Sequence, residues 1–165
     1  MTFFVLAAEV KWQVDTEISG IFWMILGFAS IFSGILFGAI ADKIGNYKAI
    51  TLIFLIQIVA HAILYFDSPT NFLWISALLF GLSAWGVPSI MAVLSSELFG
   101  IENTAKILSL VTIFFAVGQI IGPVGAGIIV DIFGDFSYVF LVSTFLAFGG
   151  FLLSFWLDFQ HKKTI

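Results

Sequence analysis

Five long runs of apolar residues, separated by short polar segments, make up most of the sequence. They contain 23, 18, 23, 24 and 20 residues and cover Ile18–Ile40, Ala49–Phe66, Phe72–Leu94, Ile107–Val130 and Tyr138–Leu157. A helix of about 20 apolar residues crosses the hydrocarbon core of a bilayer and satisfies its own backbone hydrogen bonds there. The pattern therefore predicts an all-α membrane protein with five full transmembrane helices, which form a single membrane domain over residues 1–165.

The first eight residues, MTFFVLAA, are also apolar but are too short to cross a bilayer, and Glu9 and Lys11 follow them. No positively charged segment precedes this run and no small-x-small cleavage site follows it, which argues against a signal peptide. We interpret residues 1–17 as a helical stub and an outer loop. The stub is expected to be the end of a helix whose beginning is missing from this chain.

Composition supports a lipid environment and excludes several classes of function. Hydrophobic residues make up 61% of the chain and charged residues 10%, against about 25% charged residues in soluble domains; the mean hydropathy is +1.17. The chain has no cysteine, a net charge of −4 and only two histidines, which lie 100 residues apart. We therefore expect a lipid bilayer as partner, with no nucleic acid, no metal site and no cofactor. No hydrolase motif is present, so we do not expect an enzyme.

The lysines predict the orientation of the chain. Five of the six lie in the loops Asp42–Lys48 and Glu97–Lys106 and in the tail over 158–165, and only Lys11 lies in the alternate segments. Because positively charged loops remain in the cytoplasm, these two loops and the C-terminus are expected there. The loops around Asp15, Asp67 and Asp135 are then expected outside.

A short motif occurs twice in the chain. Residues 38–45 (GAIADKIG) and 127–134 (GIIVDIFG) share the spacing Gly-x-x-x-Asp-x-x-Gly and lie 89 residues apart. Each copy ends an apolar run, and three predicted crossings separate them, so they are expected on opposite faces of the membrane. This relation is typical of inverted-topology repeats. Glycine and aspartate are, however, also common wherever a helix ends.

Three motifs carry a resemblance to the major facilitator superfamily. The segment 38–48, GAIADKIGNYK, resembles that family's loop motif G-x-x-x-D-[RK]-x-G-[RK]-[RK], matched here by Gly38, Asp42, Lys43, Gly45 and Lys48. Asn46 and Tyr47 stand where the family usually has basic residues. The segment 118–127, GQIIGPVGAG, resembles the family's Gly-Pro helix motif through Gly118, Gly122, Pro123 and Gly127. The segment Glu97–Lys106 resembles its acidic-then-basic loop.

The order of spans and motifs resembles the C-terminal half of a bacterial transporter of this family, helices 8 to 12 plus the end of helix 7. The resemblance implies one six-helix bundle in the cytoplasmic membrane that moves an unknown small-molecule substrate by alternating access. Its implied partner is a separate N-terminal half or a second copy of the chain. The alternative interpretation is a non-transporting membrane fragment, or an assembly partner for a separately encoded first half.

Small residues mark two predicted helix faces. In the first full helix they recur at helical spacing, so another helix is expected to pack against them; these residues are Gly27, Ser30, Gly34 and Gly38. Gly118 and Gly122 make a similar step in the fourth full helix, where Pro123 predicts a bend. Both a gating role and static packing are open for that helix.

Two ionisable residues have alternative interpretations. His61 lies inside a span, one helical turn after Gln57, and either relays protons or packs as a neutral, hydrogen-bonded histidine. Packing is favoured, since every carboxylate lies in a loop or at a helix end. For Asp42, the resemblance implies a latch between two halves, and the alternative is a solvated cap at the membrane edge.

Residues that contact substrate are expected on the run Phe72–Leu94, which corresponds to a cavity-lining helix in the resemblance. Ser83, Trp85 and Ser89 flank Gly86 and Pro88, where a distorted backbone exposes polar groups. Gln119, on the next helix, is the remaining candidate.

Overall fold

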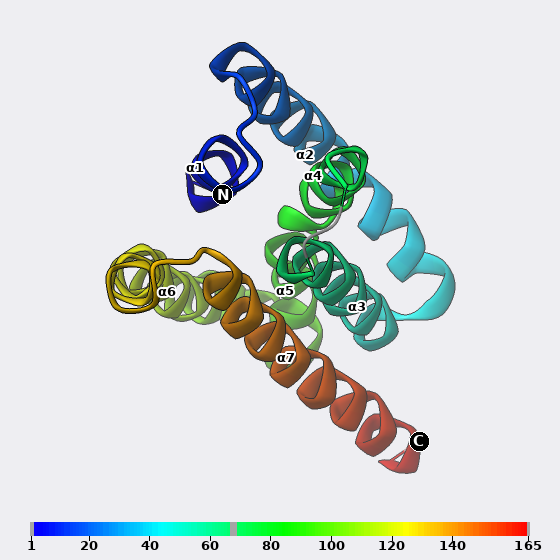
Figure 1. Ribbon diagram of the computed structural model, residues 1–165. Helices are drawn as coiled ribbons and strands as arrows, with labels where there is room; N and C mark the ends of the chain where they lie inside the picture. The colour runs from blue at the N-terminus through cyan, green and yellow to red at the C-terminus, as the bar shows by residue number, and fades with distance from the viewer. Residues whose placement is uncertain (1, 67–68, 165) are drawn as a thin grey trace.

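The computed structural model describes residues 2–66 and 69–164, with side chains at 3–66 and 69–162 (Figure 1). Asp67 and the side chain of Lys163 therefore lie outside the described residues. The elements are α1 (Thr2–Lys11), α2 (Thr16–Ile44), α3 (Asn46–Tyr65), α4 (Asn71–Ala84), α5 (Gly86–Phe99), the short 3₁₀ helix η1 (Ile101–Asn103), α6 (Thr104–Phe133) and α7 (Ser137–Thr164).

The predicted fold class is confirmed within the described residues. Five segments are long and apolar enough to cross a membrane, and they are Thr16–Ile44, Asn46–Tyr65, Asn71–Phe99, Ile101–Phe133 and Ser137–Lys162. Most extend a few residues beyond the predicted apolar runs, because backbone hydrogen bonding continues through the polar residues at the ends. The third segment is α4 and α5 together, and α1 is the ten-residue helix predicted as a stub.

The last glycine of each repeated motif ends a helix. Gly45 follows α2 with φ 91° and Gly134 follows α6 with φ 68°, a region that favours glycine because it has no Cβ. Lys11 donates a hydrogen bond to Ser137, close after Gly134, so the second motif lies near the beginning of α2. Gly45 lies at the other end of that 29-residue helix, about 43 Å away. The two motifs therefore occupy opposite ends of the bundle.

Each end of the bundle has its own buried cluster. The end near the α1–α2 connection is aromatic, with the Phe22 ring 4.3 Å from that of Trp74 and 5.6 Å from that of Phe4. The opposite end is mostly aliphatic, with the Phe37 ring buried among Ile53 and other residues of α2, α3 and α5. Between them α3 and α7 lie side by side along most of their lengths (Figure 1).

The face of α2 that packs is not the one predicted from its glycines. The buried stripe consists of Ser19, Phe22, Leu26, Ala29, Ser33, Phe37 and Ala41. In the predicted stripe only Gly34 has a close neighbour, Ser89 of α5, while Gly27 and Gly38 have open space beside them. No helix of the described chain covers those two glycines, so the packing of a helix against them remains a prediction. An apolar membrane helix has no hydrophobic contrast between its faces, so composition alone does not identify the packed one.

α6 stands apart from the other helices at one side of the bundle (Figure 1). It contains 30 residues and none of them is buried. In each of the other four spans, 22–33% of the residues in an apolar 18-residue segment are buried. Apart from adjoining residues and the nearby backbone of α6 itself, no described atom lies within 4 Å of the position that a Cβ would occupy on Gly118 or on Gly122, so both have open space beside them. The small-residue face of α6 is therefore uncovered.

Candidate functional site

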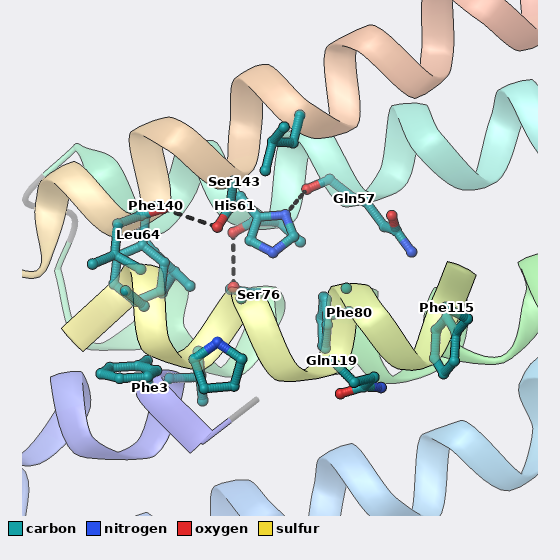
Figure 2. Close-up of a pocket in the computed structure, with 18 residues that line it drawn as sticks. Phe3, Gln57, His61, Leu64, Ser76, Phe80, Phe115, Gln119, Phe140 and Ser143 are labelled. Atoms are coloured by element: carbon teal, nitrogen blue, oxygen red, sulfur yellow. Dashed lines mark hydrogen bonds between the residues drawn. The ribbon is translucent and has the colours of Figure 1, made fainter. Parts of the chain in front are cut away.

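A cavity among the described residues lies between α6 and the body of the bundle (Figure 2). Its volume is about 610 Å³, and it is lined by residues of α1, α3, α4, α6 and α7. No lining residue carries a formal charge. The polar side chains on its wall are Gln57, His61, Ser76, Gln119 and Ser143, and aromatic residues such as Phe3, Phe80, Phe115 and Phe140 supply much of the rest.

His61 is held by its own helix and by an aromatic neighbour. Its Nδ1 lies 2.7 Å from the carbonyl oxygen of Gln57, and its ring lies edge-to-face against Phe80 with centroids 5.2 Å apart. Figure 2 shows the imidazole facing the cavity. The predicted hydrogen bond is therefore present, and no carboxylate among the lining residues is available for a proton relay.

The hydroxyl groups of the cavity wall are bound to backbone. Ser76 Oγ donates to the carbonyl oxygen of Ala60 at 2.8 Å and so joins α4 to α3. Ser143 Oγ donates to the carbonyl oxygen of Val139 at 2.9 Å, within α7. Because these groups are satisfied internally, the wall behaves as an apolar, aromatic surface with few free donors.

The cavity brings together only part of the predicted site. Gln119 lines it, as do Gly118, Gly122 and Pro123 of the Gly-Pro motif, whereas Ser83, Trp85 and Ser89 do not. α6 continues through Pro123 as one helix, and the predicted bend remains a prediction. Gly127, the last residue of that motif, also has open space beside it.

The remaining three candidates surround a break between two helices. α4 ends at Ala84 and α5 begins at Gly86, with Trp85 between them at φ −101° and ψ 3°. Trp85 is 54% exposed, while Ser83 is fully buried and donates to the carbonyl oxygen of Phe80. The distortion expected around Gly86 and Pro88 is thus present in the backbone.

Contacts to α2 hold this break in place. The backbone N–H of Trp85 donates to Ser33 Oγ at 3.1 Å. Ser89 Oγ donates to the Trp85 carbonyl oxygen at 2.9 Å and lies 2.9 Å from the position that a Cβ on Gly34 would occupy. The break is therefore a fixed feature of the α2–α4–α5 interface.

The loop motif and the C-terminal part of α7 lie at the same end of the bundle. Asn46 Nδ2 donates to both carboxylate oxygens of Glu97 at 2.9 Å, joining α3 to α5. The Tyr47 ring lies 5.0 Å from that of His161. Asp42, Lys43 and Lys48 are exposed, so the predicted latch residues are available for contacts outside this chain.

The opposite end is organised around Asp135. Its Oδ1 accepts the backbone N–H and the hydroxyl of Ser137, each at 2.9 Å. The backbone hydrogen bond, aided by the hydroxyl of Ser137 and the charge of Lys11 and opposed by partial burial, holds the pKa of Asp135 below its ordinary value. This carboxylate therefore caps α7 in its charged form.

Within the described part of the chain, no three His, Asp or Glu residues are close enough to share a metal ion. The sequence identifies Gln57, His61 and Gln119 as polar residues inside spans. It does not reveal the contributions of Phe3, Ser76 and Ser143, because nothing in the sequence indicates that three helices far apart in the chain enclose one space.

Comparison with known proteins gives a family match over the whole chain. The model of the family described as Major Facilitator Superfamily matches residues 1–165. The multi-drug resistance efflux pump PmrA of Streptococcus pneumoniae serotype 4 (strain ATCC BAA-334 / TIGR4) is 24% identical over 149 residues, and that of strain ATCC BAA-255 / R6 is equally similar. The aligned region covers 87% of this chain but 37% of each pump. No solved structure matches the chain.

Proposed function

This chain belongs to the major facilitator superfamily, and from that membership we propose that it forms one helical bundle of a secondary transporter that moves a small solute by alternating access. The observation that carries the proposal is the pair of Gly-x-x-x-Asp-x-x-Gly motifs at opposite ends of the bundle. Two three-helix units of opposite direction are the arrangement on which such carriers are built. The chain spans 37% of the length of the curated relatives it matches, so transport is assigned to an assembly that includes more polypeptide.

A second bundle is the proposed partner. The glycines Gly27 and Gly38 of α2 and Gly118 and Gly122 of α6 have open space beside them, and small residues let another helix backbone approach closely. Two helices with uncovered small-residue positions suit a chain that packs against other membrane helices. Asp42 and Lys43 are the proposed latch to such a partner, and their exposure at the end of α2 supports this role.

We propose an orientation with the C-terminus in the cytoplasm of a bacterial cell. The end that carries the loop motif holds Lys43 and Lys48, together with Lys162 of the α7 tail. The opposite end holds Lys11. This bias supports a cytoplasmic location for the first end.

The proposed solute contacts are Trp85, Ser89 and Gln119, none of which is charged. Ser83, the fourth residue predicted from the sequence, is fully buried and so cannot contact solute in this structure. An aromatic ring and hydroxyl or amide groups suit a neutral or weakly cationic organic molecule. The similarity to pumps named for multidrug efflux supports testing amphipathic aromatic compounds first. We propose no catalytic residue, since binding and conformational change suffice for transport.

The test is the accumulation of an amphipathic fluorescent cation in cells that express the chain together with an N-terminal bundle from a relative. We expect lower accumulation in those cells than in cells with either part alone. Trp85→Ala should remove the difference, and Trp156→Ala, which changes a similarly exposed tryptophan of α7, should retain it. No difference across a panel of solutes, despite normal expression of both parts, would favour the non-transporting alternative.

A further inference from the structure

The cavity beside α6 contains three polar side chains with hydrogen-bonding groups that the described part of the chain does not use. They are the amides of Gln57 and Gln119 and the second ring nitrogen, Nε2, of His61. The hydroxyls of Ser76 and Ser143, in contrast, donate to backbone carbonyl oxygens. The two amides and the imidazole are therefore the main polar groups that the cavity offers to a ligand.

The hydrogen bond of His61 determines what its second ring nitrogen does. Nδ1 lies 2.7 Å from the carbonyl oxygen of Gln57, and a carbonyl oxygen only accepts, so Nδ1 carries the proton. In the neutral imidazole Nε2 is then an acceptor. Figure 2 shows the ring facing the cavity, with Phe80 beside it. The cavity thus presents an acceptor that a donor group on a ligand would satisfy.

The rest of the wall favours a neutral aromatic molecule. No lining residue carries a formal charge, so an ion inside the cavity would lose its hydration without gaining a partner. The apolar part of the wall includes five phenylalanines, which are Phe3, Phe4, Phe80, Phe115 and Phe140. Aromatic rings make favourable stacked and edge-to-face contacts with one another.

The size and the edge of the cavity suit a small molecule. Its volume of about 610 Å³ lies within the range of about 300–1,000 Å³ that is usual for small-molecule sites. Two of its lining residues, Phe115 of α6 and Leu146 of α7, are 48% and 73% exposed. The cavity is therefore open at this edge, and a neutral molecule can enter there.

We propose that this cavity is a binding site for a neutral aromatic molecule that carries a hydroxyl or N–H group, which donates to Nε2 of His61. The amides of Gln57 and Gln119 are available to a second polar group of the same molecule. Trp85 and Ser89 do not line the cavity, so the site is separate from the break between α4 and α5, and only Gln119 belongs also to the proposed solute contacts. The inference goes beyond the proposed function, because it concerns binding by this chain and is tested without measuring transport.

The test compares two compounds that differ in one hydrogen-bond donor. The chain has no cysteine, so Gly122→Cys gives a single reporter in the cavity wall, where its Cβ has room. The rate of maleimide labelling is measured on the purified full chain in detergent, with increasing 1-naphthol or 1-methoxynaphthalene. We expect 1-naphthol to reach half-maximal protection at about a tenfold lower concentration. General uptake into apolar space would favour the ether instead.

Matched variants identify the source of the difference. In the Gly122→Cys chain, His61→Leu should remove the advantage of 1-naphthol over the ether. His161→Leu, which changes the histidine at the end of the bundle, should keep it. Val124→Cys, 60% exposed on α6 and not part of the cavity wall, should label at the same rate with and without either compound.

Gln119→Leu is a second variant, at an exposed position with no described hydrogen bond to lose, and it should also weaken protection by 1-naphthol. Equal protection by the two compounds, or no protection by 1-naphthol, would overturn the proposal. So would an advantage of 1-naphthol that persists in His61→Leu. The comparison of the two compounds requires no substitution at His61, so it decides the question even if His61→Leu does not fold.

Discussion

The buried hydroxyl of Ser33 on α2 accepts the backbone N–H of Trp85, at the break between α4 and α5, over 3.1 Å. A break inside a membrane span frees backbone groups that lipid cannot satisfy. Ser33 is fully buried and so supplies the partner that water would supply elsewhere. The distorted segment with three of the predicted solute residues therefore depends on a side chain of another helix.

Ser33→Ala should destabilise the chain by about 1–3 kcal/mol, since it leaves a buried N–H without an acceptor. Ser30→Ala is the matched control, because Ser30 Oγ bonds only the Gly27 carbonyl of its own helix in the described contacts. The measurement is equilibrium unfolding in mixed detergent micelles, followed by tryptophan fluorescence. Equal and small losses for both variants would contradict the role assigned to Ser33.

Gly81→Ala should separate α2 from α4. The added Cβ would lie 2.8–2.9 Å from the Ala29 Cβ and the Leu26 carbonyl oxygen, and backbone cannot move aside as a flexible side chain can. We expect a loss of about 1–3 kcal/mol in unfolding free energy. Gly27→Ala, at an open position, should be neutral or gain up to about 1 kcal/mol from better helix propensity. Equal losses at both positions would contradict the close approach.

The sequence predicted the spans well because their signal is local. Each apolar run is long enough to cross a bilayer. The last glycine of each repeated motif, Gly45 or Gly134, ends a helix and has a positive φ. The break at Trp85 was also foreseen from Gly86 and Pro88. These features depend on neighbours along the chain, which the sequence displays directly.

Which faces meet is a long-range property and was predicted less well. The glycine stripe on α2 indicated a packed face, but the buried stripe lies beside it and includes Phe22 and Phe37. Gln119 was placed with Ser83 and Trp85, yet it lines a cavity that those residues do not reach. Where nearly every residue is apolar, hydrophobic periodicity carries little information about neighbours.

Acidification should weaken the α6–α7 junction through Asp135. Its folded pKa lies below the ordinary value of 3.8, so its contribution to stability is present above that pH and is lost as the pH falls through the folded pKa. Asp135→Asn should therefore be less stable than the natural chain at pH values above 3.8, and the difference should shrink as the pH falls below that value and through the lower, folded pKa. Thermal unfolding across this range measures it. A constant difference for Asp135→Asn across this range would refute the linkage.

Asn46→Arg should strengthen the contact between α3 and α5. Asn46 Nδ2 already donates to both Glu97 carboxylate oxygens, and a guanidinium can donate to the same two oxygens from two nitrogens and adds a positive charge. Because both groups lie near the surface, the expected gain is about 0.2–1 kcal/mol. The double variant Asn46→Arg/Glu97→Gln should lose that gain. A gain that persists without the carboxylate would show that the pair is not its source.

The arrangement of the two repeated motifs predicts that Asp42 and Asp131 are reached from opposite sides of the membrane. Single cysteines at these positions, in a chain without any other cysteine, leave all lysines in place, and acidic residues contribute little to orientation. A membrane-impermeant maleimide added to intact cells should label Asp131→Cys, and Asp42→Cys should be labelled only in inverted vesicles. Asp15→Cys should behave like Asp131→Cys, because α2 begins at the end where α6 finishes. If Asp42→Cys is labelled in intact cells and Asp131→Cys only in inverted vesicles, the orientation predicted from the lysines is wrong, but the inverted arrangement of the repeat is still supported. If Asp42→Cys and Asp131→Cys are labelled from the same side, three helices do not separate the motifs across the bilayer, and the inverted arrangement is wrong.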